Sequence, residues 1–442
     1  MTRQLRDTAD TLLRHGIMLA LGLASAPLMA RLLGPEGLGT FSLVFVTSSI
    51  AKLVVAGGIP AAIIYFTGKN RLSRRSIGRP IWMMIGIAIG AAFLVPAVVF
   101  PLLKQTDAGS ELDGAVFGYL VAAIIAGTSL NVGQGFLRLF RDFRMLTAVT
   151  LTSRALLLAG IFVLLLMGRQ SVNAVLWNQI ISTTFAVALV WSLVRRRWSC
   201  ETGETETIAE PATCREVAAY GYKATAANLM SILNCRADTL MLAALCSPLQ
   251  LGLYAVAVMI AEKVWMLSSS ISEVSSTYIA TGDERSEERI RQALATAKWT
   301  GIGTFLLCIA VAAATPLIPL VFGERFSGAC LPMLLLLPGI WARGTSRVLA
   351  GGISAIGKPG LNAWLGFGAL CLNIAINAAL LPSYGAAGAA IATSVSYSCL
   401  LASRLAFLKL KRFSLVPLLT INSGEWATLA SIASRRLRIM RP

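Results

Sequence analysis

GPEGLGTF, at residues 34–41, and SPLQLGLY, at residues 247–254, follow one pattern, P-x-x-L-G-x-[FY], at an offset of 213 residues. Each stretch joins two long apolar segments. The same offset brings the third apolar segment of the chain onto the ninth and the start of the fifth beside the eleventh. The sequence therefore indicates two repeated halves of six segments each. Because six is an even number, both halves have the same orientation, which predicts parallel repeats with a substrate held between them.

The composition is that of a membrane protein. Apolar residues make up 56% of the 442 residues and charged residues 14%, and the mean hydropathy is +0.71. A membrane-spanning helix needs about 20 mostly apolar residues. Such stretches lie at 12–32, 38–66, 81–103, 114–137, 146–168, 173–194, 217–245, 249–280, 299–322, 329–356, 360–381 and 385–408. We expect an all-α polytopic membrane protein with about twelve transmembrane helices in two parallel-repeat six-helix bundles around a central cavity.

The net charge of +18 comes mostly from basic residues whose distribution between loops indicates how the chain is oriented in the membrane. Of the 39 Lys and Arg residues, 26 fall in one set of alternating loops and 4 in the other. Basic residues collect on the cytoplasmic side of a membrane, so both termini are expected there. The excess charge then gives no reason to expect a nucleic-acid partner. The single His, and eight Cys without a CxxC pair, predict no metal site and no disulfide framework.

The expected domain organisation follows from the repeat. It comprises an N-terminal six-helix bundle at 1–198, a cytoplasmic linker at 199–216, a C-terminal six-helix bundle at 217–412 and a basic cytoplasmic tail at 413–442. The linker is polar and acidic. We expect no signal-peptide cleavage after Ala26, because Pro27 follows it and the apolar run continues to Leu33.

Several stretches resemble a known family. ARLLGPEGLGTFSLVFVTSSIAKLVVAGGIPAAI is similar to the first two helices of bacterial polysaccharide flippases, which belong to the multidrug/oligosaccharidyl-lipid/polysaccharide exporter superfamily. RADTLMLAALCSPLQLGLYAVAVMIAEKV resembles the seventh and eighth helices of that family, PLIPLVFGERF the end of the ninth, and LPSYGAAGAAIATSVSY the beginning of the twelfth. The resemblances keep their order over most of the chain.

The resemblance implies transport, not catalysis. It implies a flippase that moves undecaprenyl-diphosphate-linked oligosaccharide repeat units across the bacterial plasma membrane by alternating access, for surface or exopolysaccharide biosynthesis. The implied partners are a polyprenyl-diphosphate-linked glycan, membrane lipids and other polysaccharide-assembly proteins, with no cofactor. Members of the lipid II flippase branch normally have two extra helices and a longer chain, so this sequence fits that branch less well. The drug-exporting branch shares the twelve-helix count.

Charged residues inside the spans are the candidate site. A charge at mid-membrane is costly and usually faces a partner or a wet cavity. The candidates for binding a diphosphate are cations: Lys52, Arg236, Lys263, Arg343 and Arg347. The candidates for ion coupling are acids: Asp238, Glu262 and Glu273. Arg236 with Asp238, and Glu262 with Lys263, are equally well explained as structural pairs. Lys52, Arg343 and Arg347 have no acid adjacent in sequence.

Three classes of function remain open. An ion-coupled drug or small-molecule exporter of the same superfamily is the main alternative to a glycan flippase. A membrane enzyme, such as a polysaccharide polymerase or ligase, would need reactive groups in a large outward loop, and the outward loops here are short. A chain with no GxxxxGK[ST] motif is not expected to hydrolyse ATP.

Overall fold

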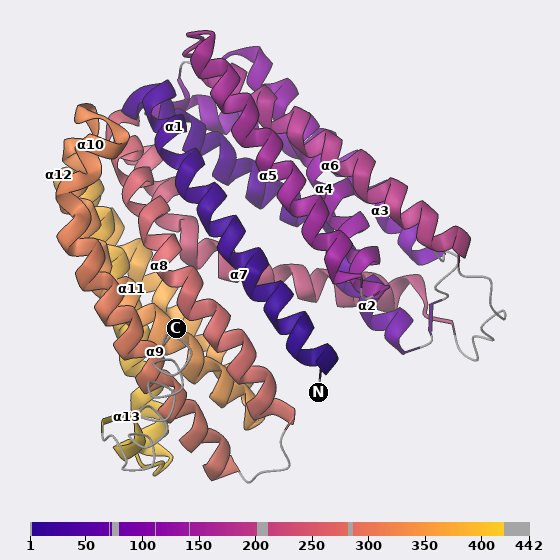
Figure 1. Ribbon diagram of the computed structural model, residues 1–442, viewed down its shortest axis with the longest axis vertical. Coiled ribbons are helices and arrows are strands. Elements are labelled where there is room, and N and C mark those ends of the chain that lie inside the picture. Colours follow the sequence, from indigo (N-terminus) through magenta and orange to yellow (C-terminus); the bar gives the residue numbers. More distant parts are fainter. Residues whose placement is uncertain are drawn as a thin grey trace, which may run out of the picture. The chain divides into compact units, whose positions relative to one another are not determined.

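The computed structural model describes residues 2–69, 71–72, 79–110, 112–140, 142–200, 211–281 and 286–419 (Figure 1). Within these ranges it describes no side chains for residues 2–15, 18–19, 143, 198–200, 266–281, 286, 417 and 419. Three parts of the sequence analysis lie outside the described residues: linker residues 201–210, tail residues 420–442 and the side chain of Glu273.

Every element in the described ranges is a helix. The first half contains α1 Thr2–Ala56, α2 Ile59–Gly68, α3 Arg79–Lys104, η1 Asp107–Gly109, α4 Gly114–Leu139, α5 Phe143–Leu166 and α6 Val172–Cys200. The second half contains α7 Cys214–Leu245, α8 Pro248–Thr281, α9 Ser286–Ala314, η2 Thr315–Leu317, α10 Ile318–Phe322, η3 Glu324–Ala329, α11 Cys330–Ala355, α12 Pro359–Leu410 and α13 Val416–Leu419. The chain is an all-α polytopic membrane protein, as the sequence predicts.

Glycines separate the spans that share one long helix. Gly34, with φ 66°, interrupts α1 between the first and second predicted spans, and Gly385, with φ 50°, interrupts α12 between the eleventh and twelfth. Residues with a Cβ rarely adopt this left-handed conformation, so glycine marks both turns. The predicted second span at 38–66 lies within one described segment that could cross a membrane, Ala20–Gly68, but it is not a single helix. It breaks at Gly57 and Gly58, with φ 53° and 72°, and α2 begins at Ile59 directly before Pro60.

Eight described segments are long and apolar enough to cross a membrane, and two of them contain two predicted spans each. The predicted spans outside this set are the seventh, which forms α7, and the eighth at 249–280, which forms α8; side chains of α8 are described only as far as Trp265. Both are helical. Charged residues lower their hydropathy, including Arg236 and Asp238 in α7 and Glu262 and Lys263 in α8. These two helices are therefore expected to face protein more than lipid.

The chain forms two compact units, each with an apolar core. The first unit contains residues 1–260, 314–335 and 370–393, and the second contains 261–313, 336–369 and 394–442. The core of the first unit includes Ile59, Phe66, Met84, Phe136 and Val190. The core of the second includes Ile290, Leu294, Leu349, Ile353 and Leu408. The bundle boundaries expected from the repeat stay a prediction.

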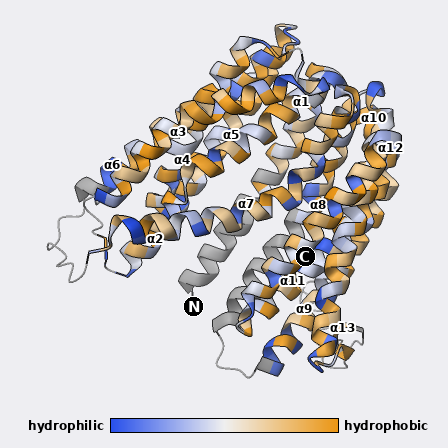
Figure 2. Cartoon of the chain, turned by 180° about the vertical axis from the view of Figure 1, so that it is seen from behind, coloured by the Kyte–Doolittle hydropathy of each residue, from blue (hydrophilic) through white to orange (hydrophobic). Residues whose placement is uncertain are grey.

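Apolar residues make up much of the helical ribbon, as the hydropathy colours of Figure 2 show, and many large ones are exposed. On α3, Trp82, Phe93 and Leu94 are exposed, Leu94 to 68%. Water-exposed apolar surface of this extent would be unfavourable. These side chains are suited to contact with lipid, which agrees with a multi-pass membrane protein.

Candidate functional site

Arg343 and Arg347 share one face of α11, as their spacing predicts. The Arg343 guanidinium lies 4.7 Å from the ring centroid of Trp265 on α8 and 4.5 Å from that of Tyr397 on α12. It also donates a hydrogen bond to the Tyr397 hydroxyl. The Arg347 guanidinium lies 5.2 Å from the same Trp265 ring. Ring faces attract cations, so aromatic side chains hold both guanidinium planes in place.

Burial differs between the two arginines. Arg343 is half-buried, whereas Arg347 is exposed. Tyr397, which contacts Arg343, is 6% exposed. The indole N–H of Trp265 is buried and has no hydrogen-bond partner within the described residues. This group of Trp265, Arg343, Arg347 and Tyr397, here the Arg343 cluster, therefore offers two cations and one further donor. Such a combination suits an anionic ligand.

Lys52 belongs to the other compact unit. It is half-buried in α1, and its ammonium lies 5.8 Å from the Phe45 ring centroid. Its aliphatic chain rests against Gly127 of α4, where a Cβ would overlap the Lys52 Cδ and lie 3.1 Å from its Cγ. A residue larger than glycine at position 127 would displace the lysine. The Lys52 side chain therefore packs along α4 at Gly127.

Arg154 is a site residue that sequence reasoning missed. Its position near one end of the predicted fifth span favours an interfacial side chain. In the structure it lies eleven residues into α5, about 17 Å from the first residue, and its side chain is exposed. It lies within electrostatic range of Lys52, so the first half carries two cations inside predicted spans. The sequence signal that could have identified Arg154 as a site residue is its position, eight residues inside a predicted span.

Asp238 is enclosed by donors. It is 5% exposed and accepts hydrogen bonds from the hydroxyl of Tyr254 on α8 and from Thr393 Oγ1 on α12, at 3.0 Å for Thr393. The backbone N–H of Thr239 donates to it at 2.7 Å, and the Thr239 hydroxyl lies at 3.3 Å. A buried carboxylate needs such partners. Tyr254 is fully buried, so this cage is part of the packed interior.

Two asparagines of α12 extend the cage. Asn373 Nδ2 donates to Thr393 Oγ1 at 3.4 Å, and Asn377 Nδ2 donates to Asn373 Oδ1 at 3.0 Å. Asn377 is fully buried, and its Oδ1 has no donor within the part of the chain that the structure describes. The group of Asp238, Thr393, Asn373 and Asn377, here the Asp238 cluster, is rich in oxygen acceptors. It suits a small cation or a proton.

The remaining candidates are less defined. Arg236, Glu262 and Lys263 are half-buried and take part in interactions. The structure does not bring Arg236 into the group of donors around Asp238 named above. Glu273 belongs to α8, but its side chain lies outside the described residues. In the second compact unit Arg343 and Arg347 share Trp265, and in the first Lys52 lies within electrostatic range of Arg154.

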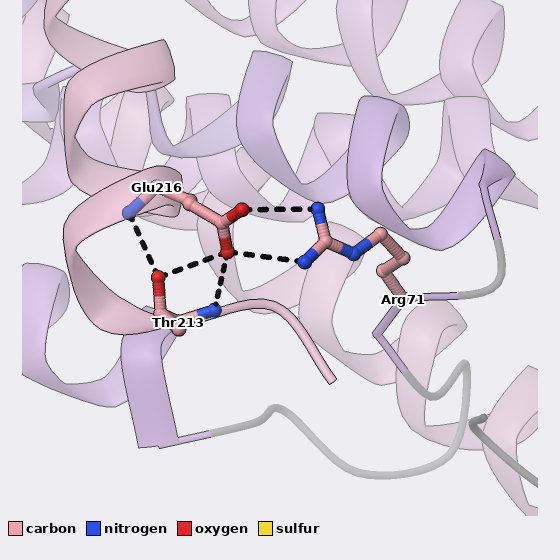
Figure 3. A network of polar contacts seen from close by, with 3 residues as sticks. All are labelled: Arg71, Thr213 and Glu216. Carbon is pink, nitrogen blue, oxygen red and sulfur yellow. Dashed lines mark hydrogen bonds and ion pairs between the residues drawn. The ribbon is translucent and has the colours of Figure 1, made fainter. Parts of the chain in front are cut away.

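A polar network ties the beginning of α7 to the end of α2 (Figure 3). The Glu216 carboxylate accepts from the Thr213 backbone N–H at 2.9 Å, from the Thr213 hydroxyl and from both terminal nitrogens of Arg71 at 3.1 and 3.2 Å. Thr213 and Glu216 form a capping box at the start of α7. These hydrogen bonds, first the one from the Thr213 backbone, lower the pKa of Glu216 from 4.5 to about 2.

Aromatic and backbone contacts continue this network along α7. Tyr220 stacks on Tyr65 with ring centroids 4.2 Å apart. Gly221 meets Gly57 and Gly58 so closely that a Cβ at Gly58 would overlap the Gly221 carbonyl. The beginning of α7 is therefore attached to the first half of the chain, and its later part, through Asp238, to α8 and α12.

Comparison with known proteins identifies the family. Residues 28–331 match the family model described as polysaccharide biosynthesis protein. The match spans more than half of the chain, so the chain belongs to this family. No curated protein sequence matches it significantly.

Solved transporter structures share the fold. An inward-facing multidrug resistance MATE family transporter of the MOP superfamily is similar with a TM-score of 0.69 and 15% identity, covering 90% of this chain and 95% of that chain. The lipid II flippase MurJ, in an inward closed conformation, has a TM-score of 0.65 and 14% identity, with 92% and 89% covered. The MATE multidrug transporter DinF-BH has a TM-score of 0.59 and 17% identity, with 95% and 97% covered. The chain thus has the fold of membrane transporters and flippases.

Proposed function

We propose that the protein is a flippase for undecaprenyl-diphosphate-linked oligosaccharide repeat units, working by alternating access. The polysaccharide biosynthesis family and the transporter fold support this class. The observation that carries the choice of substrate is the contrast between cations and the acid within the spans. Arg347 is exposed and Arg343 half-buried, whereas Asp238 is 5% exposed and held by hydroxyl groups. We therefore assign ligand binding to the arginines.

The Arg343 cluster is our candidate for the diphosphate. Arginine offers a planar fork of donors that matches phosphate oxygens, and stacking on Trp265 and Tyr397 fixes the orientation of that fork. A preoriented guanidinium loses less freedom when a ligand binds. Arg236 and Lys263 are further candidates for the same head group.

Lys52 and Arg154 form a second cationic group, in the first half. Lysine supplies a compact charge without a fixed fork, so we assign Lys52 to charge attraction more than to oriented hydrogen bonding.

Among the acids we assign ion coupling to Asp238. Its carboxylate and the buried Asn377 Oδ1 are acceptors that a monovalent cation or a proton would satisfy. Glu262 is half-buried, and Glu273 has no described side chain, so neither carries an equal argument. Occupation of the Asp238 cluster would then favour one conformation of α7, α8 and α12.

The proposed location is the bacterial plasma membrane, with both termini in the cytoplasm. This orientation rests on the 26-to-4 distribution of basic residues between alternate loops. The proposed partners are the lipid-linked glycan, membrane lipids and the other proteins of polysaccharide assembly.

Deletion of the gene tests the function. We expect lipid-linked repeat units to be made and to stay on the cytoplasmic leaflet, while surface polysaccharide is lost. Full-length surface polysaccharide in a deletion strain that contains no other flippase would contradict the proposal. A deletion strain that gains sensitivity to cationic drugs, with normal polysaccharide, would instead indicate a drug exporter.

A further inference from the structure

The two copies of the repeated motif touch each other. A Cβ at Gly39 would overlap the carbonyl oxygen of Pro248 and lie 3.0 Å from the backbone nitrogen of Gly252. A Cβ at Gly252 would overlap the carbonyl oxygen of Pro35 and lie 3.1 Å from the Pro35 Cα. Position 248 is position 35 shifted by 213 residues, and position 252 is position 39 shifted likewise. The two contacts are therefore one contact made twice, as at a two-fold axis.

This reciprocity explains why the motif recurs. Each glycine must lack a side chain because the proline carbonyl of the other copy occupies its space. The leucine of each motif copy is fully buried, Leu38 in the first copy and Leu251 in the second. Backbone lies against backbone at the four proline and glycine residues. We call the contacts of Pro35 and Gly39 with Pro248 and Gly252 the clasp.

One charged side chain adds to the clasp. Arg31, on the turn of α1 before Gly34, donates from Nε to the Val321 carbonyl at 2.9 Å and from Nη2 to the Leu320 carbonyl at 2.6 Å. These carbonyls belong to the C-terminal end of α10, where a cation is favourable. Arg31 is exposed, so solvent can replace these bonds when the clasp opens.

We propose that the clasp, with Arg31, is the outward gate of the transporter, closed in this structure. The inference rests on the proposed function, because the orientation predicted from basic residues puts residues 33–37 and 246–248 on the outer side. Two backbones in van der Waals contact leave no room for a glycan between them. Passage to the outer leaflet between the repeats then requires the clasp to separate.

Alanine substitution and thiol labelling test the gate. The background is a variant with Cys235 as its single cysteine. Cys235 is half-buried in α7, ten residues or about 15 Å from the outer end at Leu245. We expect Gly39→Ala and Gly252→Ala each to raise its labelling by an impermeant maleimide added to spheroplasts by about tenfold, a change of about 1.4 kcal/mol. The two effects should be similar because the contacts are equivalent. Surface glycan should fall in both variants.

Two further variants complete the test. Gly303→Ala, at a site on α9 with open space around the glycine, should leave labelling and glycan unchanged. Arg31→Ala adds no bulk and should raise labelling about threefold. If Gly39→Ala and Gly252→Ala do not reach the membrane, Arg31→Ala alone decides the outcome. Labelling at the parent rate in every variant that reaches the membrane overturns the gate. A parent protein that restores no surface glycan contradicts the proposed function instead.

Discussion

The two copies of the repeat differ in chemistry where they agree in fold. Phe41 and Tyr254 end the two copies of the motif, and both are buried. Phe41 stacks on Phe45, whereas the Tyr254 hydroxyl binds Asp238. The same offset relates Asp238 to Ser25, whose hydroxyl only bonds the Gly22 carbonyl of its own helix. The acid cluster is thus a property of the second half alone.

The cationic groups show a related difference. Lys52 is the counterpart of Trp265 at the 213-residue offset. In the first half this position supplies the cation itself, and in the second half it supplies the ring on which Arg343 and Arg347 stack. Corresponding positions therefore lie near positive charge in both halves. The repeat determines the positions near which a positive charge lies. The residue types at those positions determine how rigidly the charged side chain is held.

The largest effect is expected at the Asp238 cluster. Asp238→Ala removes the acceptor for Tyr254, Thr393 and Thr239, and buried donors without an acceptor are costly. We expect a loss of about 3 kcal/mol of stability, measured as thermal unfolding of the purified protein in detergent.

The matched change in the first half, Ser25→Ala, should shift unfolding by less than about 1 kcal/mol, because that hydroxyl binds only a carbonyl of its own helix. Asp238→Asn keeps an acceptor but no charge, so it should fold better than Asp238→Ala and still fail to transport. An Asp238→Asn protein with full surface-glycan activity would refute ion coupling through this residue.

Arg343 should come next. Arg343→Ala removes a stacked guanidinium and is expected to lower transport at least about tenfold. Arg343→Lys should remain impaired, because an ammonium does not provide the planar fork. Surface-glycan complementation, normalised to protein level in the membrane, measures both. Disappearance of the protein from the membrane would mean that Arg343 is structural.

Lys52 sharpens the comparison because its charge should matter more than its shape. Lys52→Arg is expected to keep more surface-glycan activity than Lys52→Ala, the latter losing about threefold to tenfold. A substitution that keeps the charge should therefore be tolerated at Lys52 and damaging at Arg343. This difference distinguishes a compact charge from an oriented fork. Equal activity of Lys52→Ala and the parent protein would remove Lys52 from the site.

The smallest effect concerns the network at the start of α7. The pKa of Glu216 is lowered to about 2, so its ionised form is favoured in the folded protein. Its contribution to stability is complete above the unfolded pKa of 4.5 and is lost as pH falls through about 2. The difference in melting temperature between the parent and Glu216→Gln should be constant above pH 5 and shrink below 4.5. A constant difference down to pH 2.5 would contradict this account.

Sequence patterns predict the spans and the repeat well because both depend on local hydropathy and spacing. Gly34 and Gly385 mark turns between spans, as the gaps between apolar stretches indicate. Hydropathy alone does not show the break at Gly57 and Gly58, because both flanking segments are apolar, although Pro60 inside the span allows a kink there. The close approach of Gly221 is seen only in the structure.

The site is only partly predictable for the same reason. Periodicity puts Arg343 and Arg347 on one face of α11, and the structure confirms it. It does not reveal that Trp265 stacks on both, that Arg154 lies beside Lys52, or that Thr393 reaches Asp238 over 155 residues of sequence. Those contacts arise from packing between distant helices, about which the residues of a single helix carry little information.

Translocation in reconstituted vesicles tests the central claim most directly. The substrate is a fluorescent polyprenyl-diphosphate-linked sugar, and a membrane-impermeant quencher reports the fraction in the outer leaflet. The account predicts that the protein makes the inner-leaflet pool accessible, that Arg343→Ala slows this at least about tenfold, and that a prenyl sugar without phosphate is not moved. Transport of the uncharged lipid at the same rate as the diphosphate lipid, or no transport above protein-free vesicles, would contradict it.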